Sequence, residues 1–498
     1  MPSTSSSSGA RQDLTHGPIG RTLLVFSLPI LAGNVLQSLN GSVNAVWVGR
    51  YLGEEALTAT ANANNIMFFL IGAVFGIGMA ATILVAQAMG AKDNAQAKRV
   101  IGTSATFFIG ISLVIALAGL PLSRHILGWM DTPKAAMPLA EAYLRIIFMA
   151  VPFLYMFSFL SAVLRGTGDT RTPFVFLMLS VVLDIGLNPL LIFGLGPFPK
   201  MGIAGSSTAT LVANVIALIA MLFWLRHRRN PLWISRAERG LYRPDPVILR
   251  SLVAKGVPMG LQMILTSLAM IMMIGMVNHY GVNMTSAYGA SLQLWTYVQM
   301  PAMAIGAACS SMAAQNVGAG HWDRVNATAR TGIVFNFLMT GALIAPIILF
   351  DHALLSLFLP AGSAALEPAR HLNQIAIWSF LFFGVTFVIS GVVRSTGAVI
   401  PPLLILGFSL WGVRIPFANL LQPHMGADAI WWSFPASSIV ALVLSMAYYR
   451  WGHWRQARML TQDSRAVAMP AEVPAHPPSP VANPIPELEP ATVVPTVK

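Results

Sequence analysis

The sequence is poor in charge, and poorest in acids. Only 10% of its 498 residues are charged, whereas soluble domains carry roughly 25%. There are 18 acidic residues against 30 basic ones, and 55% of the chain is hydrophobic. Together with a mean hydropathy of +0.67, these values exclude a soluble globular domain and predict a polytopic membrane protein.

Cysteine is almost absent as well. The single cysteine, Cys309, lies among small residues, so no internal disulfide is possible and we expect it to pack inside a helix bundle. The sequence has no Cys–His metal framework, and its ten histidines include no HExxH motif. We therefore expect neither an enzyme nor a bound cofactor.

Long apolar stretches dominate instead. A membrane span needs about 20 apolar residues, and twelve segments meet this requirement. We predict an all-α polytopic membrane protein whose spans are residues 21–46, 58–86, 101–122, 138–163, 174–195, 203–225, 252–278, 287–314, 331–350, 372–393, 401–421 and 430–450.

The basic residues are distributed unevenly along this pattern. The net charge of +12 could suggest a nucleic-acid partner, but most Lys and Arg fall in the termini and in alternate loops. The opposite loops hold only Arg50, Arg124, Lys134, Lys200 and Arg370. This is the positive-inside signal, which places both termini in the cytoplasm and excludes nucleic-acid binding.

The chain repeats itself at an offset of 229 residues. LRGTGDTRTP at 164–173 matches VRSTGAVIPP at 393–402, and Pro29 matches Pro258 at the same offset. Gln87 matches Gln315 at an offset of 228. Each copy contains an even number of spans, so the two copies must have the same orientation in the membrane.

This repeat sets the predicted domains. We expect two parallel six-helix bundles at 21–225 and 252–450, joined by a basic linker at 226–251. The Ser-rich segment 1–20 is predicted to be a flexible cytoplasmic N-terminus. The Pro-rich segment 459–498 is predicted to be a disordered cytoplasmic tail.

Several motifs resemble one transporter family. LRGTGDTRTP, LNPLLIFGLGPFPKMGIAGSSTAT at 187–210 and VNAVWVGRYLGEEALTA at 43–59 are similar to those of multidrug and toxic compound extrusion (MATE) transporters. The resemblance covers roughly residues 20–450. It implies a bacterial inner-membrane antiporter whose substrates are bulky, often cationic organic compounds, and it favours the DinF-like branch with a cation site in the N-terminal half.

One carboxylate lies deep in a span. Asp184 is about 16 Å along the helix from Pro173, near the middle of the bilayer, where an acid marks an ion path or a proton relay. The alternative is neutralisation by Arg145 or Arg414. We group Asp184 with four polar residues as the predicted coupling site: Asn188, Asn44, Asn40 and Ser206.

The coupling ion stays open between H⁺ and Na⁺. The resembling branch often shows Asn before Asp, whereas this chain has Asp184 followed by Asn188, and Asn44 stands where the family commonly has Asp. The missing acid favours protons, although Na⁺ at Asp184 remains an alternative. No other metal site is expected.

Further polar and aromatic residues are predicted to line a substrate cavity. Asn34 and Gln37 share a helix face with Asn44, which either lines the cavity or bonds another helix. The second half contributes Gln262, Thr266, Gln293, Trp295 and Gln299. The predicted function is multidrug efflux by a monomeric secondary antiporter; the alternative is a lipid-linked precursor flippase of the same superfamily.

Overall fold

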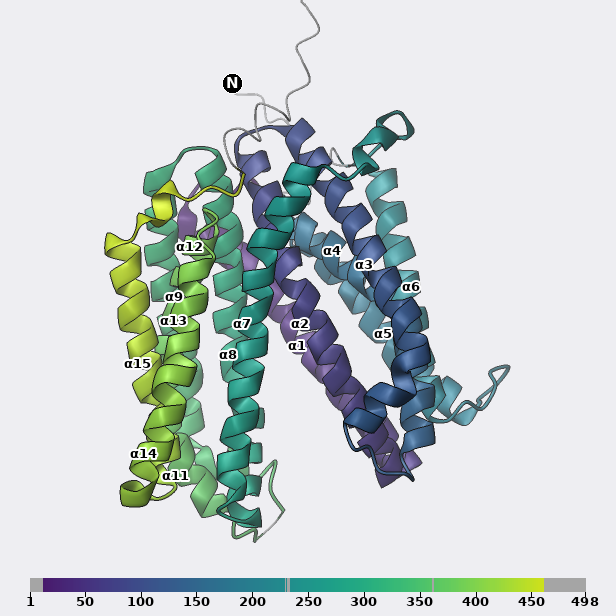
Figure 1. Cartoon of the computed structure of the whole chain (residues 1–498), viewed down its shortest axis with the longest axis vertical. Coiled ribbons are helices and arrows are strands. Elements are labelled where there is room, and N and C mark those ends of the chain that lie inside the picture. Colours follow the sequence, from purple (N-terminus) through teal and green to yellow (C-terminus); the bar gives the residue numbers. More distant parts are fainter. Residues whose placement is uncertain (1–11, 229, 231–232, 361, 461–498) are drawn as a thin grey trace, which may run out of the picture. The chain divides into compact units, whose positions relative to one another are not determined.

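The computed structural model describes residues 12–460 except 229, 231–232 and 361. In this part of the chain every predicted span is helical (Figure 1). The predicted flexible N-terminus (1–20) and the predicted disordered tail (459–498) lie mostly outside the described residues. The helices of the first half are α1 (Ile19–Leu52), α2 (Glu54–Gly90), α3 (Asn94–Trp129), α4 (Met137–Gly166), α5 (Arg171–Phe193) and α6 (Ile203–His227).

The second half follows the same order with more breaks. It consists of α7 (Pro246–Asn278), α8 (Val282–Gly318), α9 (Trp322–Leu349), the short α10 (Asp351–Leu355), α11 (Leu366–Ala376), α12 (Ser379–Arg394), α13 (Ile400–Gly407), α14 (Ile415–Met425) and α15 (Asp428–Trp451). The α11–α12 pair is bent by 44°. A π-helical segment, Phe408–Arg414, joins α13 to α14.

By length and apolarity, the described residues contain ten candidate membrane helices, or eleven if the bent α11–α12 pair is one span. The predicted span that fails this test is 287–314 in α8, which is helical but contains several Ser and Gln residues. Most of these polar residues are buried inside the protein, where they avoid lipid. The all-helical membrane fold is therefore confirmed.

Local chemistry explains where the helices begin. Asp93 caps α3 by accepting from the Gln96 amide at 2.8 Å, and Asp245 caps α7 in front of Pro246. In the turn between α4 and α5, Gly168 has a φ of 93°, which glycine tolerates. Asp169 then accepts from the amide and hydroxyl of Thr172, at 2.9 and 2.6 Å.

The linker between the halves is tied to α3. Lys98 donates to Glu238 at 2.7 Å, and the Thr106 hydroxyl donates to the Tyr242 carbonyl at 2.7 Å. The hydrogen bond from Lys98 lowers the pKa of Glu238 to about 2, so Glu238 stays ionised at physiological pH.

The two halves meet at one end through a symmetric contact. Gln87 of α2 donates to the Ser395 carbonyl at 2.6 Å, and Gln315 of α8 donates to the Gly166 carbonyl at 2.8 Å. Both pairs are repeat equivalents of each other. We call these four residues the glutamine clamp. Each glutamine donates to the turn of the opposite half, α4–α5 or α12–α13, and we call these two turns the hinges.

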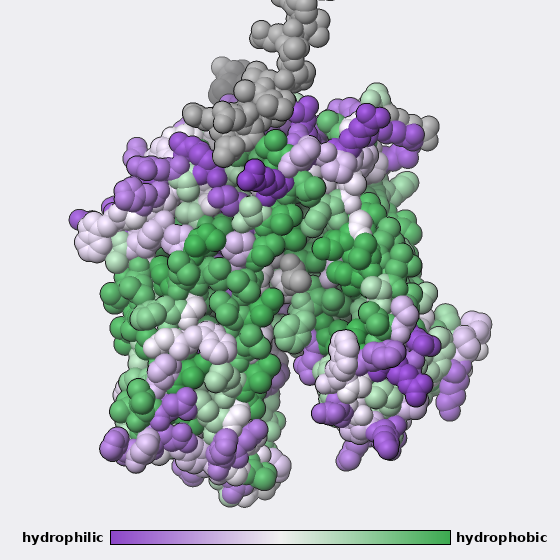
Figure 2. Space-filling model, in the orientation of Figure 1, coloured by the Kyte–Doolittle hydropathy of each residue, from purple (hydrophilic) through white to green (hydrophobic). Residues whose placement is uncertain are grey.

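Glycines allow the clamp to close. A Cβ on Gly90 would collide with the backbone of Gln315, and one on Gly318 would collide with the backbone of Gln87. Within residues 12–460, the helices converge at this end and diverge toward the other (Figure 1). Figure 2 shows the resulting gap at the lower edge.

Candidate functional site

Asp184 occupies a buried polar network between α1, α5 and α6. Its side chain lies on α5 and is 2% exposed. Asn40 and Asn44 of α1 donate to Oδ2 at 2.8 and 3.0 Å. Because these two asparagines are four residues apart, both point from one face of α1 to the same carboxylate oxygen.

The other carboxylate oxygen is bound from α5 and α6. The Thr210 hydroxyl donates to Oδ1 at 3.1 Å, and Asn188 donates to the same oxygen at 3.2 Å. Asn188 also donates to Asn44 Oδ1 at 3.0 Å, so it links the two helices that hold the acid. Four donors thus surround one carboxylate.

Two amide oxygens in this network have no hydrogen-bond partner. Among the described residues, Asn40 Oδ1 and Asn188 Oδ1 are buried and unsatisfied, which is costly for a polar atom. Na⁺ prefers such hard oxygen ligands, and a proton would instead bind the carboxylate itself. The residues present can therefore hold either ion.

Neither arginine considered from the sequence neutralises Asp184. Arg145 pairs with Glu141 at 2.7 Å, and Arg414 donates from Nε to the Ser437 hydroxyl at 2.9 Å. Asp184 makes no ion pair within residues 12–460. Its charge is met by amides and a hydroxyl alone.

Sequence reasoning missed Thr210 in this network. Ser206, the predicted residue, is buried one turn earlier on α6, and its carbonyl accepts from the Thr210 hydroxyl at 3.3 Å. The signal was available, because Thr210 lies four residues beyond Ser206 and on the same helix face. Asn34 and Gln37 lie on α1 but do not join the network, and Gln37 is exposed.

The candidates in the second half do not form one group. Gln262 is buried and accepts from Arg394 at 2.8 Å, while Thr266 is exposed and donates to the Gln262 carbonyl at 2.8 Å. Gln293 is exposed and Gln299 is half-buried. They occupy separate positions on α7 and α8.

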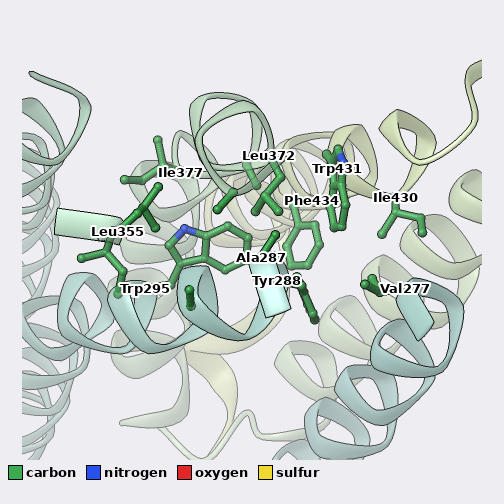
Figure 3. Close-up of a cluster of buried hydrophobic side chains, with 14 of the residues drawn as sticks. Val277, Ala287, Tyr288, Trp295, Leu355, Leu372, Ile377, Ile430, Trp431 and Phe434 are labelled. Atoms are coloured by element: carbon green, nitrogen blue, oxygen red, sulfur yellow. The ribbon is translucent and has the colours of Figure 1, made fainter. Parts of the chain in front are cut away.

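Trp295 lies in the hydrophobic core of the second half. It is 1% exposed, donates to Asn373 at 2.9 Å, and packs against Tyr288, Phe380 and Phe434 with ring centroids 5.4–6.1 Å apart. Figure 3 shows Trp295 with Tyr288 and Phe434. In this conformation Trp295 is a packing residue rather than part of an open cavity wall.

A helical membrane protein built from two matching halves, with a buried acid in one of them, has the architecture of duplicated membrane transporters. The family model MatE matches residues 29–190 and 258–420. The chain therefore belongs to the MATE family, whose members are transporters and not enzymes.

Two curated relatives cover most of the chain. It is 39% identical over 434 residues to the probable multidrug resistance protein YoeA of Bacillus subtilis, covering 87% of this chain and 94% of the relative. It is 33% identical to the probable multidrug resistance protein YpnP of the same organism, covering 90% and 99%.

Solved structures share the fold. A structure described as the outward-facing conformation of a multidrug resistance MATE family transporter superposes with a TM-score of 0.82 at 20% identity, covering 90% of this chain and 98% of that one. A MATE in complex with MaL6 gives 0.82 at 21% identity, covering 88% and 97%. This protein is a multi-pass MATE family efflux transporter with bacterial homologues.

Proposed function

We propose that the protein exports bulky, amphipathic and often cationic organic compounds in exchange for protons or Na⁺, with Asp184 as the coupling group. The observation that carries this proposal is a buried carboxylate that accepts from four donors and that pairs with no basic side chain of the described residues. A buried acid that lacks a fixed counter-charge is the group for which a mobile cation is the natural partner.

Ion binding can change the contact between α1 and α5. A proton on Oδ2 turns that oxygen into a donor, so it can no longer accept from both Asn40 and Asn44. Either amide must then turn or move away, which loosens α1 from α5. Na⁺ would instead draw in Asn40 Oδ1 and Asn188 Oδ1.

The coupling set we propose is Asp184, Asn188, Asn44 and Asn40, with Ser206 placing Thr210 through the α6 backbone. This set lies wholly in the first half, which supports assignment to the DinF-like branch. The proposed bundles remain 21–225 and 252–450, with the linker at 226–251. We propose that a monomer is the functional unit, because both halves of the transporter lie within one chain.

We propose alternating access around the glutamine clamp. The positive-inside distribution assigns the clamp end to the cytoplasm, so this conformation is closed on the cytoplasmic side and open to the periplasm. Export then requires the clamp to break, so that the substrate can enter from the cytoplasm.

Topology gives the first test. Reporter fusions after Gly240 and after Gln462 should both report a cytoplasmic location, and a fusion after Lys200 should report a periplasmic one. Both fusion points expected in the cytoplasm belong to the side that carries the excess of Lys and Arg, and basic segments translocate poorly. A periplasmic signal at Gly240 would reverse the proposed orientation.

Transport by the purified protein reconstituted into lipid vesicles gives the second test. One charge moving through 100 mV is worth about 2.3 kcal/mol, which supports a roughly 40-fold gradient of an uncharged substrate at about 1.4 kcal/mol per decade. We expect substrate accumulation to follow an imposed proton gradient, or a Na⁺ gradient if Na⁺ is the coupling ion. Accumulation that follows neither gradient but requires ATP would refute secondary antiport.

A further inference from the structure

A segment before α1 ties the two halves together at the clamp end. The Gln12 amide donates to the Gly168 carbonyl at 3.1 Å, in the α4–α5 hinge of the first half. Two residues further on, the Leu14 carbonyl accepts from Asn316 Nδ2 of α8 at 3.1 Å. We call residues 12–18 the strap. Its backbone therefore bonds the first half and the second half at two closely spaced residues.

The second half holds the strap at several points. The Leu14 side chain is 0% exposed and belongs to a hydrophobic cluster formed mainly by α8, α9 and α12. Arg324 of α9 donates from a terminal nitrogen to the Gly17 carbonyl at 3.1 Å and from Nε to Asn316 Oδ1 at 3.2 Å. Arg324 thus fixes both the strap and the asparagine that binds it. We call these contacts of the strap with the second half the anchor.

The strap also lies directly on the first hinge. A Cβ at Gly168 would collide with the Gln12 carbonyl. The same hinge accepts from Gln315 of the clamp through the Gly166 carbonyl, and Gln315 precedes Asn316 on α8. The end of α8 therefore holds this hinge twice, directly through the clamp and indirectly through the strap. Opening of the clamp end must break the hydrogen bond between strap and hinge or remove the strap from its anchor.

Hydrogen bonds within the strap fix the path between these two contacts. Asp13 Oδ1 accepts from the Thr15 amide at 2.8 Å and from the Thr15 hydroxyl at 2.6 Å. Asp13 Oδ2 lies 2.9 Å from Nδ1 of His16. A side-chain bond from Asp to the amide two residues on closes a turn, and this turn encloses Leu14. The distance between the hinge contact and the anchor therefore cannot increase freely when the halves begin to separate.

The hinge of the second half is covered in a different way. Gly397 corresponds to Gly168 at the offset of 229 residues, and a Cβ there would lie 2.7 Å from the Arg458 carbonyl. The Thr396 hydroxyl donates to the Trp454 carbonyl at 2.8 Å. Arg458 and Trp454 follow α15, so this cover belongs to the same half as the hinge beneath it. Of the two covers, the strap is the one that joins a hinge to the opposite half.

We propose that the strap stabilises the closed form of the clamp end and sets how often this end opens. The inference rests on the proposed alternating access around the clamp. A contact shifts a two-state equilibrium only if it differs between the two states. The bond of Gln12 to Gly168 differs, because opening separates the α4–α5 hinge from α8. The anchor acts through that bond, because it holds Gln12 in place.

Maleimide labelling of Ser395→Cys in a Cys309→Ser background measures opening, because Ser395 is fully buried in the clamp. The purified protein is labelled in nanodiscs without substrate. Gln12→Pro removes the amide hydrogen that binds Gly168, and we expect labelling to be about fivefold faster, the effect of losing one hydrogen bond. Gln12→Ala is the matched control. It keeps the amide and should label within about twofold of the protein with an unchanged strap. Equal labelling of Gln12→Pro and Gln12→Ala would overturn the proposal.

A combined variant tests whether the anchor acts through the hinge bond. Leu14→Ala should weaken the anchor and speed labelling about fivefold, whereas Leu117→Ala, at an exposed leucine of α3, should have no effect. Gln12→Pro together with Leu14→Ala should label no faster than the faster single variant, since either change already interrupts the connection. Effects that multiply in the combined variant would indicate two independent packing contacts and would also overturn the proposal.

A further variant keeps this test decisive if Leu14→Ala does not fold. Arg324 is only half-buried, and Arg324→Ala removes the bond to the Gly17 carbonyl, so it can replace Leu14→Ala in the combination with the same expected result. Labelling requires neither substrate nor an ion gradient and therefore tests the strap separately from transport. Absence of gradient-driven export by the wild type would count against the proposed function, while the labelling rates would still decide the role of the strap.

Discussion

Replacing Asp184 with asparagine is expected to abolish ion-driven export while the protein still folds. The substitution keeps the shape of the side chain, and an amide can still pair with one asparagine and with Thr210. It removes the negative charge that would bind a proton or Na⁺. A roughly 40-fold gradient supported by 100 mV should fall to no gradient, measured as dye accumulation in vesicles with an imposed ion gradient.

A matched acid elsewhere provides the control. Asp323 is exposed in the first turn of α9, and Asp323→Asn should transport like the wild type. Substrate binding by Asp184→Asn should stay within about twofold, because the predicted loss concerns coupling. Full uphill transport by well-folded Asp184→Asn would show that this carboxylate is structural and that coupling lies elsewhere.

Adding one methyl group at Gly90 is expected to open the clamp end. The new Cβ would collide with the Gln315 backbone, and a backbone can yield only if α2 separates from α8. We expect Gly90→Ala to increase the population open at this end at least about tenfold, which corresponds to roughly 1.4 kcal/mol. The measurement is maleimide labelling of Ser395→Cys, a fully buried clamp position, in a Cys309→Ser background.

Two sets of variants check this interpretation. Gly110→Ala on α3 is the control, because a Cβ there meets nothing within 4 Å. Gln87→Ala and Gln315→Ala should each speed labelling about fivefold, since each removes one hydrogen bond worth about 1 kcal/mol. Labelling that is unchanged both in Gly90→Ala and in a variant that combines Gln87→Ala with Gln315→Ala would contradict a gating role for the clamp.

Periodicity predicted the parts of the site that lie on single helices. Asp184 with Asn188 and Asn40 with Asn44 each share one helix face because they are four residues apart. A polar face in a membrane helix must turn inward, so the sequence predicted that both faces avoid lipid, but it left open whether the α1 face lines a cavity or bonds another helix. The partner of Arg394 could not be foreseen, because its contact with Gln262 joins residues of α12 and α7.

Two features required the three-dimensional structure. Threonines in membrane helices commonly bond their own backbone, as Thr210 also does with Ser206, so the shared helix face of Ser206 and Thr210 did not by itself show that Thr210 also contacts Asp184. The π-helical segment likewise depends on packing, and it moved Arg414 by one residue relative to a strict repeat. The sequence showed Arg414 and the repeat offset of 229 residues. It did not show that a π-helical turn would shift Arg414 toward the position that corresponds to Asp184.

The clamp has the geometry of a symmetric dimer interface contained in a single chain. Each glutamine binds the hinge of the other half, in the same way that residue i meets residue j and j meets i across a twofold axis. In a dimer of identical subunits, any charge introduced at one site must appear at both. Fusion of the two copies removes that constraint. It allows one half to carry Asp184 and the other Arg414 while both keep the same closing contact.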